Sequence, residues 1–206
     1  MRSQKVATMK SCLSVGVLVV LFTVILQSCS YFGDNKNVLI EEVEDYFEFQ
    51  DFDLSNYGIP ATLKLPDETA NIGAAMQPEV HHLESDFYWN IQVGPNFLLY
   101  IEDFGDNTNL VKEHKQKLEN TQFYDVEYLV DDADLIVYKI TLKVRGHANA
   151  SKNVGVKHES YHVYGERVIN GIHYEMRSRD EGFDKPIIDL MAKSIRSIKE
   201  KDQTKI

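Results

Sequence analysis

Three short turns, each between two runs of β-favouring residues, constrain the fold of this protein more than any other feature. They are Asn170-Gly171, which suits the two positive φ angles of a type I′ turn, Gly94-Pro95-Asn96, and the acidic turn 131–134. The strands on either side of these turns are expected at 86–93, 97–102, 123–130, 135–144, 157–169 and 172–179. Because connections this short join antiparallel neighbours, the sequence predicts an antiparallel sheet.

Two segments with apolar residues at helical spacing interrupt and follow these strands. The first is 107–120, whose inward positions include His114, and the second is 184–199, where Pro186 falls in the first turn. A further strand is expected at 61–66, and 67–84 is expected to be a loop with one short helix. The fold class is therefore α+β, with an antiparallel sheet of about six or seven strands covered by two helices.

The N-terminus carries three basic residues before an apolar run from Leu13 to Leu26, followed by Leu26-Gln27-Ser28-Cys29. The run is 14 residues long, whereas a membrane-spanning helix needs roughly 20. The segment resembles a bacterial lipoprotein signal, although Gln27 stands where a smaller residue is usual. The resemblance implies lipidation of Cys29; an uncleaved anchor is the alternative. The residue after Cys29 is Ser30 and not aspartate, so the resemblance also implies transfer to the outer membrane if the cell has two membranes.

These features predict four parts: a signal at 1–28, a lipidated and acidic segment at 29–56, one domain at 57–199 and a polar tail at 200–206. Within the second part, residues 30–37 are expected to form a tether. The aromatic residues that follow are expected to pack on the domain or dock on a partner. After Cys29 the sequence has no cysteine, so a packed core must stabilise the domain without disulfides.

The charge balance excludes some partners. The protein has a formal net charge of -10, and removal of the signal leaves 19 basic side chains against 32 acidic ones. Such a domain is repelled by phosphate backbones and anionic headgroups, so nucleic acid is not expected as a partner. The acyl groups on Cys29 would have to hold the protein at the membrane.

A second resemblance covers about 57–198. It rests on the Tyr57-Gly58-Ile59 entry to a strand that ends at Pro66, on the central antiparallel sheet, and on a closing helix that ends Met191-Ala192-Lys193-Ser194-Ile195. These features look like the PsbP-like or DcrB-like domain, a sandwich found in photosystem accessory proteins and bacterial lipoproteins. The resemblance implies an accessory or ligand-binding domain without a catalytic site, and it transfers no functional residue.

Several side chains are candidates for chemistry. His158, Ser160 and His162 fall on one side of a strand, and together with His81-His82, Glu159 and Glu175 they raise a metal hypothesis. The simpler interpretation is exposed histidines on a sheet face. Ser160 has histidine neighbours, but adjacency along a strand brings side chains together only modestly, and the sequence has no GxSxG, HExxH or glycine-rich phosphate motif. No catalytic residue, metal site or cofactor is therefore predicted.

Aromatic residues are the one enriched group. Phe87, Tyr88 and Trp89 alternate between the two sides of a strand, and Tyr161, Tyr164 and Tyr174 lie on the last hairpin. The candidate ligand or partner surface comprises His158, His162, Tyr164 and Tyr88, and packing of the aromatic residues in the core alone is the simpler alternative. The sequence favours a lipid-anchored envelope protein that recognises a protein partner, with a small-ligand or metal-binding lipoprotein as the alternative. An envelope hydrolase with a dispersed site has no positive support, and the oligomeric state is not specified.

Overall fold

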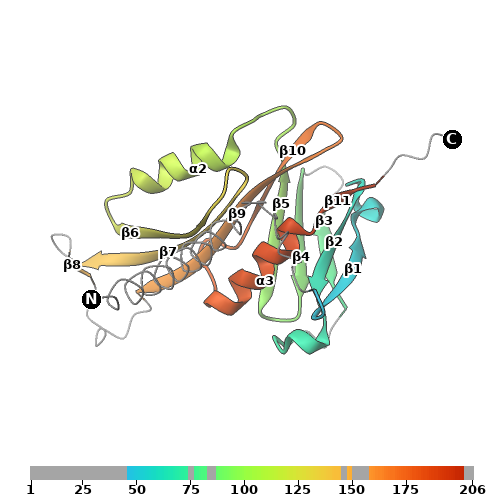
Figure 1. The fold of residues 1–206 in the computed structure, drawn as a ribbon, viewed down its shortest axis with the longest axis horizontal. Coiled ribbons are helices and arrows are strands. Elements are labelled where there is room, and N and C mark those ends of the chain that lie inside the picture. Colours follow the sequence, from blue (N-terminus) through green and yellow to red (C-terminus); the bar gives the residue numbers. More distant parts are fainter. Residues whose placement is uncertain (1–45, 74–76, 83–86, 145–147, 150–157, 202–206) are drawn as a thin grey trace, which may run out of the picture. The chain divides into compact units, whose positions relative to one another are not determined.

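The computed structural model describes residues 46–73, 77–82, 87–144, 148–149 and 158–201. The expected signal, the expected lipidation site Cys29 and the expected tether at 30–37 lie outside these residues. Within them, two antiparallel sheets and two α-helices form the α+β architecture expected from the sequence (Figure 1).

The larger sheet has the strand order β3-β4-β5-β10-β9-β7-β6, and β8 pairs with the last two residues of β7. Its strands are β3 (Glu79–His82), β4 (Tyr88–Val93), β5 (Phe97–Asp103), β6 (Tyr124–Asp131), β7 (Leu135–Val144), β8 (Ala148–Asn149), β9 (Glu159–Ile169) and β10 (Ile172–Arg177). The three predicted hairpins are confirmed: β4 pairs with β5, β6 with β7, and β9 with β10. Asn170 and Gly171 have φ angles of 51° and 81°, as a type I′ turn requires.

The smaller sheet consists of β1 (Phe49–Asp53), β2 (Ala61–Pro66) and β11 (Lys199–Glu200) in the order β1-β2-β11. The short 3₁₀ helices η1 (Leu54–Tyr57) and η2 (Glu68–Ala70) flank β2. Two predicted boundaries need correction. The folded part includes β1, although the domain was expected to begin at Tyr57, and β11 extends it to Glu200, into the expected tail. In both cases pairing with β2 orders the backbone.

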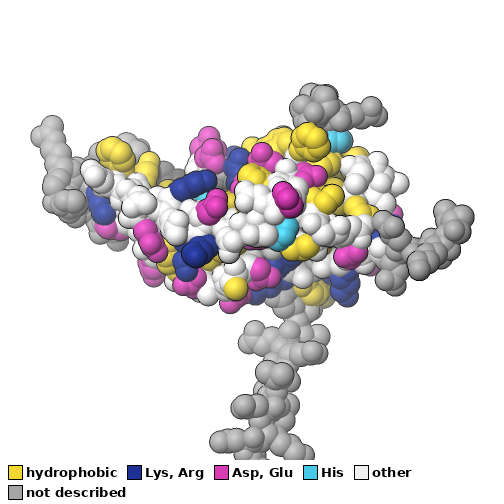
Figure 2. Space-filling view, turned by 90° about the horizontal axis from the view of Figure 1, so that it is seen from above, with side chains coloured by type: hydrophobic (Ala, Val, Ile, Leu, Met, Phe, Trp, Pro, Cys, Tyr) yellow, Lys and Arg dark blue, Asp and Glu magenta, His cyan; other side chains and the backbone are white. Residues whose placement is uncertain are grey.

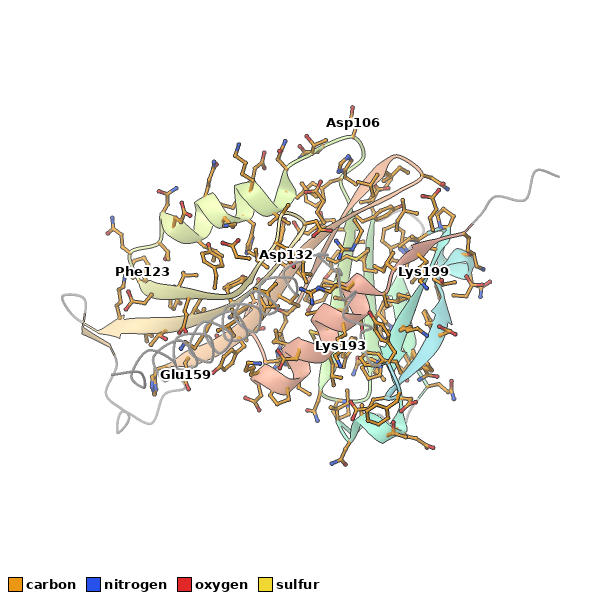
Figure 3. The ribbon with its side chains drawn as sticks, viewed as in Figure 1. Asp106, Phe123, Asp132, Glu159, Lys193 and Lys199 are labelled. Carbon is orange, nitrogen blue, oxygen red and sulfur yellow. The ribbon has the colours of Figure 1, made fainter. Side chains whose placement is uncertain are left out.

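Helix α3 (Lys185–Arg196) lies between the two sheets and supplies the centre of the main core (Figure 1). Ile188, Met191 and Ile195 of its apolar stripe are fully buried. On the side of β1, Lys193 Nζ lies 5.9 Å from the centre of the Phe49 ring, and Figure 3 labels Lys193 on this helix. The aromatic residues before Tyr57 thus pack on the domain in part: Phe49 is buried, whereas Phe47 is exposed.

Helix α2 (Leu110–Glu119) packs on the opposite face of the larger sheet (Figure 1). A second, smaller core joins them through Leu110, Val111, Ile136, Tyr138 and Tyr164. The N-cap residue Asn109 makes no side-chain capping hydrogen bond; instead the carboxylate of Glu166 on β9 accepts a 2.9 Å hydrogen bond from the backbone N–H of Leu110. The other Glu166 oxygen lies 2.6 Å from His173 Nδ1 on β10, so one carboxylate links the helix to two strands.

The loop expected at 67–84 also contains a strand. Residues Glu79–His82 pair with β4 and form one edge of the larger sheet, which places His81 and His82 on β3. This short strand alternates exposed and half-buried positions, and an edge strand receives backbone hydrogen bonds from one neighbour only, so its sequence signal is weak.

Candidate functional site

The register of the larger sheet aligns a row of side chains on its α2 face. Across five neighbouring pairings, Ile136, Tyr164, Arg177, Tyr100, Asn90 and His81 lie opposite one another in that order. A second row pairs Tyr138 with His162. Helix α2 contacts the β6, β7 and β9 side of this face, through the core it shares with Ile136 and Tyr164 and through Lys115, which pairs with Asp131 on β6. The first row therefore runs from the helix toward the β3 edge.

A pocket of about 300 Å³ opens where these rows meet α2. We call it the α2 pocket. Its apolar lining includes Leu118 and Ile140, and its ring-bearing lining includes His114, Tyr138, His162 and Tyr164. Its charged lining consists of Lys117, Arg177, Arg179 and Asp180. The volume is at the lower end of the range for small-ligand sites, roughly 300–1,000 Å³.

The imidazole of His114 connects α2 to the sheet through two contacts. Its Nε2 lies 2.9 Å from the Tyr138 hydroxyl, and its ring stacks on Tyr164 with the ring centres 3.9 Å apart. Burial raises the pKa of the Tyr138 hydroxyl well above its ordinary value, so the hydroxyl stays protonated. His114 is therefore held in one position.

On the other side of Tyr164 a series of polar contacts fixes the cationic part of the pocket. The Tyr164 hydroxyl donates a 2.5 Å hydrogen bond to Glu175, and Glu175 accepts a 2.9 Å bond from Arg177 Nε. Arg177 Nη1 donates to Asp180 at 2.9 Å, and the guanidinium lies 5.0 Å from the centre of the Tyr100 ring. Burial and the Glu175 hydrogen bond raise the pKa of Tyr164, so its hydroxyl also keeps its proton at neutral pH.

Burial lowers the pKa of His114 from its ordinary value of 6.5 to about 4, and the charges of Lys117 and Arg177 act in the same direction. Between these two values the unfolded protein binds a proton that the folded domain does not bind. The contribution of neutral His114 to stability is thus complete above pH 6.5 and is lost as the pH falls toward 4.

Replacement of His114 with glutamine should remove this pH dependence, because an amide still reaches Tyr138 by hydrogen bonding but does not titrate. We expect the native protein to lose about 2 kcal/mol more of its free energy of unfolding than His114→Gln between pH 6.5 and 4. Urea unfolding of both proteins at several pH values measures the difference. Parallel stability curves for the two would contradict the assignment.

His162 departs from its sequence interpretation. It was expected to be an exposed histidine on the sheet face, but it is only 5% exposed, and its ring stacks on Tyr138 with the centres 5.1 Å apart. Its Nε2 lies 2.8 Å from the hydroxyl of Ser160, a closer approach than adjacency along a strand suggested. A serine–histidine hydrogen bond is one part of a nucleophilic site. Ser160 is outside the lining of the α2 pocket, and the pair alone does not define a reaction.

The four residues of the expected surface are only partly brought together. His162 and Tyr164 line the α2 pocket. Tyr88 lies on β4, where its ring is 5.5 Å from that of Tyr100 and burial raises its pKa to about 12. It therefore shares the α2 face with the row but not the pocket. His158 precedes β9 and lies outside the pocket lining, and its carbonyl accepts a bond from Leu142.

The histidines of the metal hypothesis are separated by the strand order. His81 and His82 lie on β3, and β4, β5 and β10 stand between them and β9. The His82 ring stacks on Trp89, and His81 lies 3.8 Å from Glu79. Within the part of the protein that the structure describes, no three histidine, cysteine, aspartate or glutamate side chains gather as a metal site requires.

Sequence reasoning missed most of the pocket. His114 was placed on the inward face of its helix but not recognised as a site residue, and Tyr138, Arg177 and Asp180 were not singled out. The one usable signal was an imidazole on an otherwise apolar helical stripe, because a buried polar group needs a partner.

Comparisons with protein-family models, with curated proteins and with solved structures found no match for this protein. None of the helices in the described ranges is long and apolar enough to cross a membrane.

Proposed function

We propose that this protein is a lipid-anchored accessory protein of the cell envelope that recognises another envelope protein without turning it over. The N-terminal segment that resembles a lipoprotein signal supports a lipid anchor on Cys29. In a cell with two membranes, the outer membrane would be the destination. The resemblance to PsbP-like domains supports an accessory role, and membership of that family is part of the proposal.

The observation that carries the recognition role is the preformed α2 pocket. Its walls are fixed before anything binds, because His114 contacts Tyr138 and Tyr164, while Arg177 contacts Glu175 and Asp180. Side chains held in place by their neighbours lose little conformational entropy on binding, which favours affinity. Recognition needs only this arrangement, whereas turnover would also need a positioned nucleophile or an acid–base pair.

The face drawn in Figure 2 has no large area of one charge that would compete with the pocket as a recognition site. Figure 2 shows acidic and basic side chains interspersed on the face seen there, without one continuous patch of either sign. Among the exposed large apolar side chains, Phe123 and Tyr124 lie at the start of β6, and Tyr124 also lines the α2 pocket. Figure 3 shows Phe123 where the backbone passes from α2 into β6. A partner that entered the pocket would meet this apolar edge.

Crosslinking in cells tests the proposal. The tagged protein should co-purify with one specific partner after crosslinking and extraction in mild detergent. The partner should be lost with Cys29→Ala, which removes the lipidation site, and with Lys117→Glu, which reverses a charge at the pocket. It should be retained with Lys112→Glu, a matched change on the exposed side of the same helix and outside the pocket. Equal recovery with all three variants would contradict the proposed role of anchor and pocket.

A small-ligand-binding lipoprotein is the second candidate, and the pocket volume of about 300 Å³ favours it specifically. If crosslinking recovers only the monomer, without a partner, the small-ligand function is favoured instead. A metabolite screen on the purified protein would then follow.

A further inference from the structure

The charge of the α2 pocket differs from that of the whole protein. The sequence has 22 basic and 32 acidic side chains, whereas the pocket lining has three cations, Lys117, Arg177 and Arg179, and one carboxylate, Asp180. If the neighbouring Glu175, which is bonded to Arg177, is included, a single positive charge remains. A monoanion balances this charge; a phosphate dianion would exceed it.

The two arginines are oriented but retain donors. Arg177 uses Nε and Nη1 for Glu175 and Asp180, and Nη2 takes part in neither bond. Arg179 Nε donates to the carbonyl of Gly182 at 2.9 Å, and its guanidinium lies 4.0 Å from the centre of the Phe183 ring. The remaining N–H groups of both side chains can donate to a carboxylate, which guanidinium groups bind well.

The other walls suit a flat, apolar group. The rings of His114 and Tyr164 are stacked with an interplanar angle of 12°, and those of Tyr138 and His162 with one of 13°. Leu118 and Ile140 add aliphatic surface. Aromatic groups gain from offset or edge contacts with such rings beyond the burial of their area.

We infer that the α2 pocket binds a monocarboxylate that also bears an aromatic ring, either as a free small acid or as the aromatic C-terminal residue of a partner protein. This inference rests on the proposed function, which assigns recognition to the same pocket. The carboxylate contacts the arginines and Lys117, and the ring contacts the aromatic and aliphatic walls.

Isothermal titration calorimetry of the full-length protein in mild detergent at pH 7.5 tests the inference with matched probes. Benzoate represents the free acid, and N-acetylphenylalanine represents a polypeptide C-terminus. Benzamide and N-acetylphenylalaninamide have the same rings without the charge. At least one acid should bind about tenfold more tightly than its amide, because the amide lacks the charge-assisted hydrogen bonds. Tighter binding of benzoate would identify a free acid, and tighter binding of N-acetylphenylalanine would identify a C-terminus.

Lys117→Glu should weaken binding of the preferred acid by about fivefold or more, whereas Lys112→Glu should leave it unchanged. Both positions are exposed on α2, so neither change is expected to unfold the domain. Equal affinity for acid and amide, or no binding of either acid, would overturn the inference. The crosslinking experiment in cells detects binding of a partner without these probes. A negative calorimetry result would therefore reject the carboxylate inference alone, and crosslinking would still decide the proposed function.

Discussion

Replacement of Gly182 with alanine is expected to destabilise the domain by about 3 kcal/mol or more and to disrupt the α2 pocket. Gly182 has a φ of +71°, and a Cβ there would lie 2.6 Å from the carbonyl oxygen of Tyr161 and 2.9 Å from His162 Nε2. The Tyr161 carbonyl is held in place because it accepts a 3.0 Å hydrogen bond from the N–H of Phe183. The new methyl group must therefore displace either the backbone of β9 or the buried imidazole.

Gly105→Ala is the matched control for this prediction. Gly105 has a similar φ of +64°, but a Cβ there meets nothing within 4 Å. Its substitution should therefore cost only the left-handed backbone conformation, roughly 1–2 kcal/mol. Urea unfolding of both variants separates the steric effect from the backbone effect. Equal losses in the two proteins would show that the contact between Gly182 and β9 is not rigid.

Phe97→Ala is expected to have the largest effect in the main core, a loss of about 3–5 kcal/mol in the free energy of unfolding. Phe97 begins β5 directly after the turn at residues 94–96, and its side chain is 0% exposed. It belongs to the core cluster that includes α3, so its truncation leaves a cavity that the two sheets and α3 would have to fill.

Phe87→Ala provides the same chemical change at a position that is 71% exposed, next to the strand that pairs with β5. It should change stability by less than about 0.5 kcal/mol. Thermal unfolding of the two variants is the measurement. A small loss for Phe97→Ala would mean that the core around β5 collapses onto the vacated space, contrary to tight packing at this position.

Predictions from local patterns agree closely with the structure. β7 was predicted with its observed bounds, α3 lies within the predicted segment, and the Asn170-Gly171 turn has the predicted positive φ angles. Each of these elements has a strong local signal: alternation, an apolar stripe, or a dipeptide that tolerates a left-handed conformation. β1, β3 and β11 lack such signals and depend on pairing with other strands, so the sequence did not predict them as strands.

The candidate site was predictable only in part, because a binding pocket depends on strand order and side-chain packing. His162 and Tyr164 were chosen for their positions on one strand. Tyr138 and Arg177 are their neighbours because β7 and β10 pair with the two sides of β9. His114 lies in the site because α2 packs on the sheet, where Glu166 binds the first residue of the helix.

By itself the sequence determined the α+β class, the antiparallel hairpins and the two helices, because these depend on periodicity and turn chemistry within short stretches of backbone. It also contains the N-terminal segment resembling a lipoprotein signal, on which the proposed lipid anchor rests. Only the tertiary structure decided which strands are neighbours, which histidines are buried and where cations gather in an acidic protein. These properties depend on contacts between residues far apart in sequence, and no local pattern specifies them.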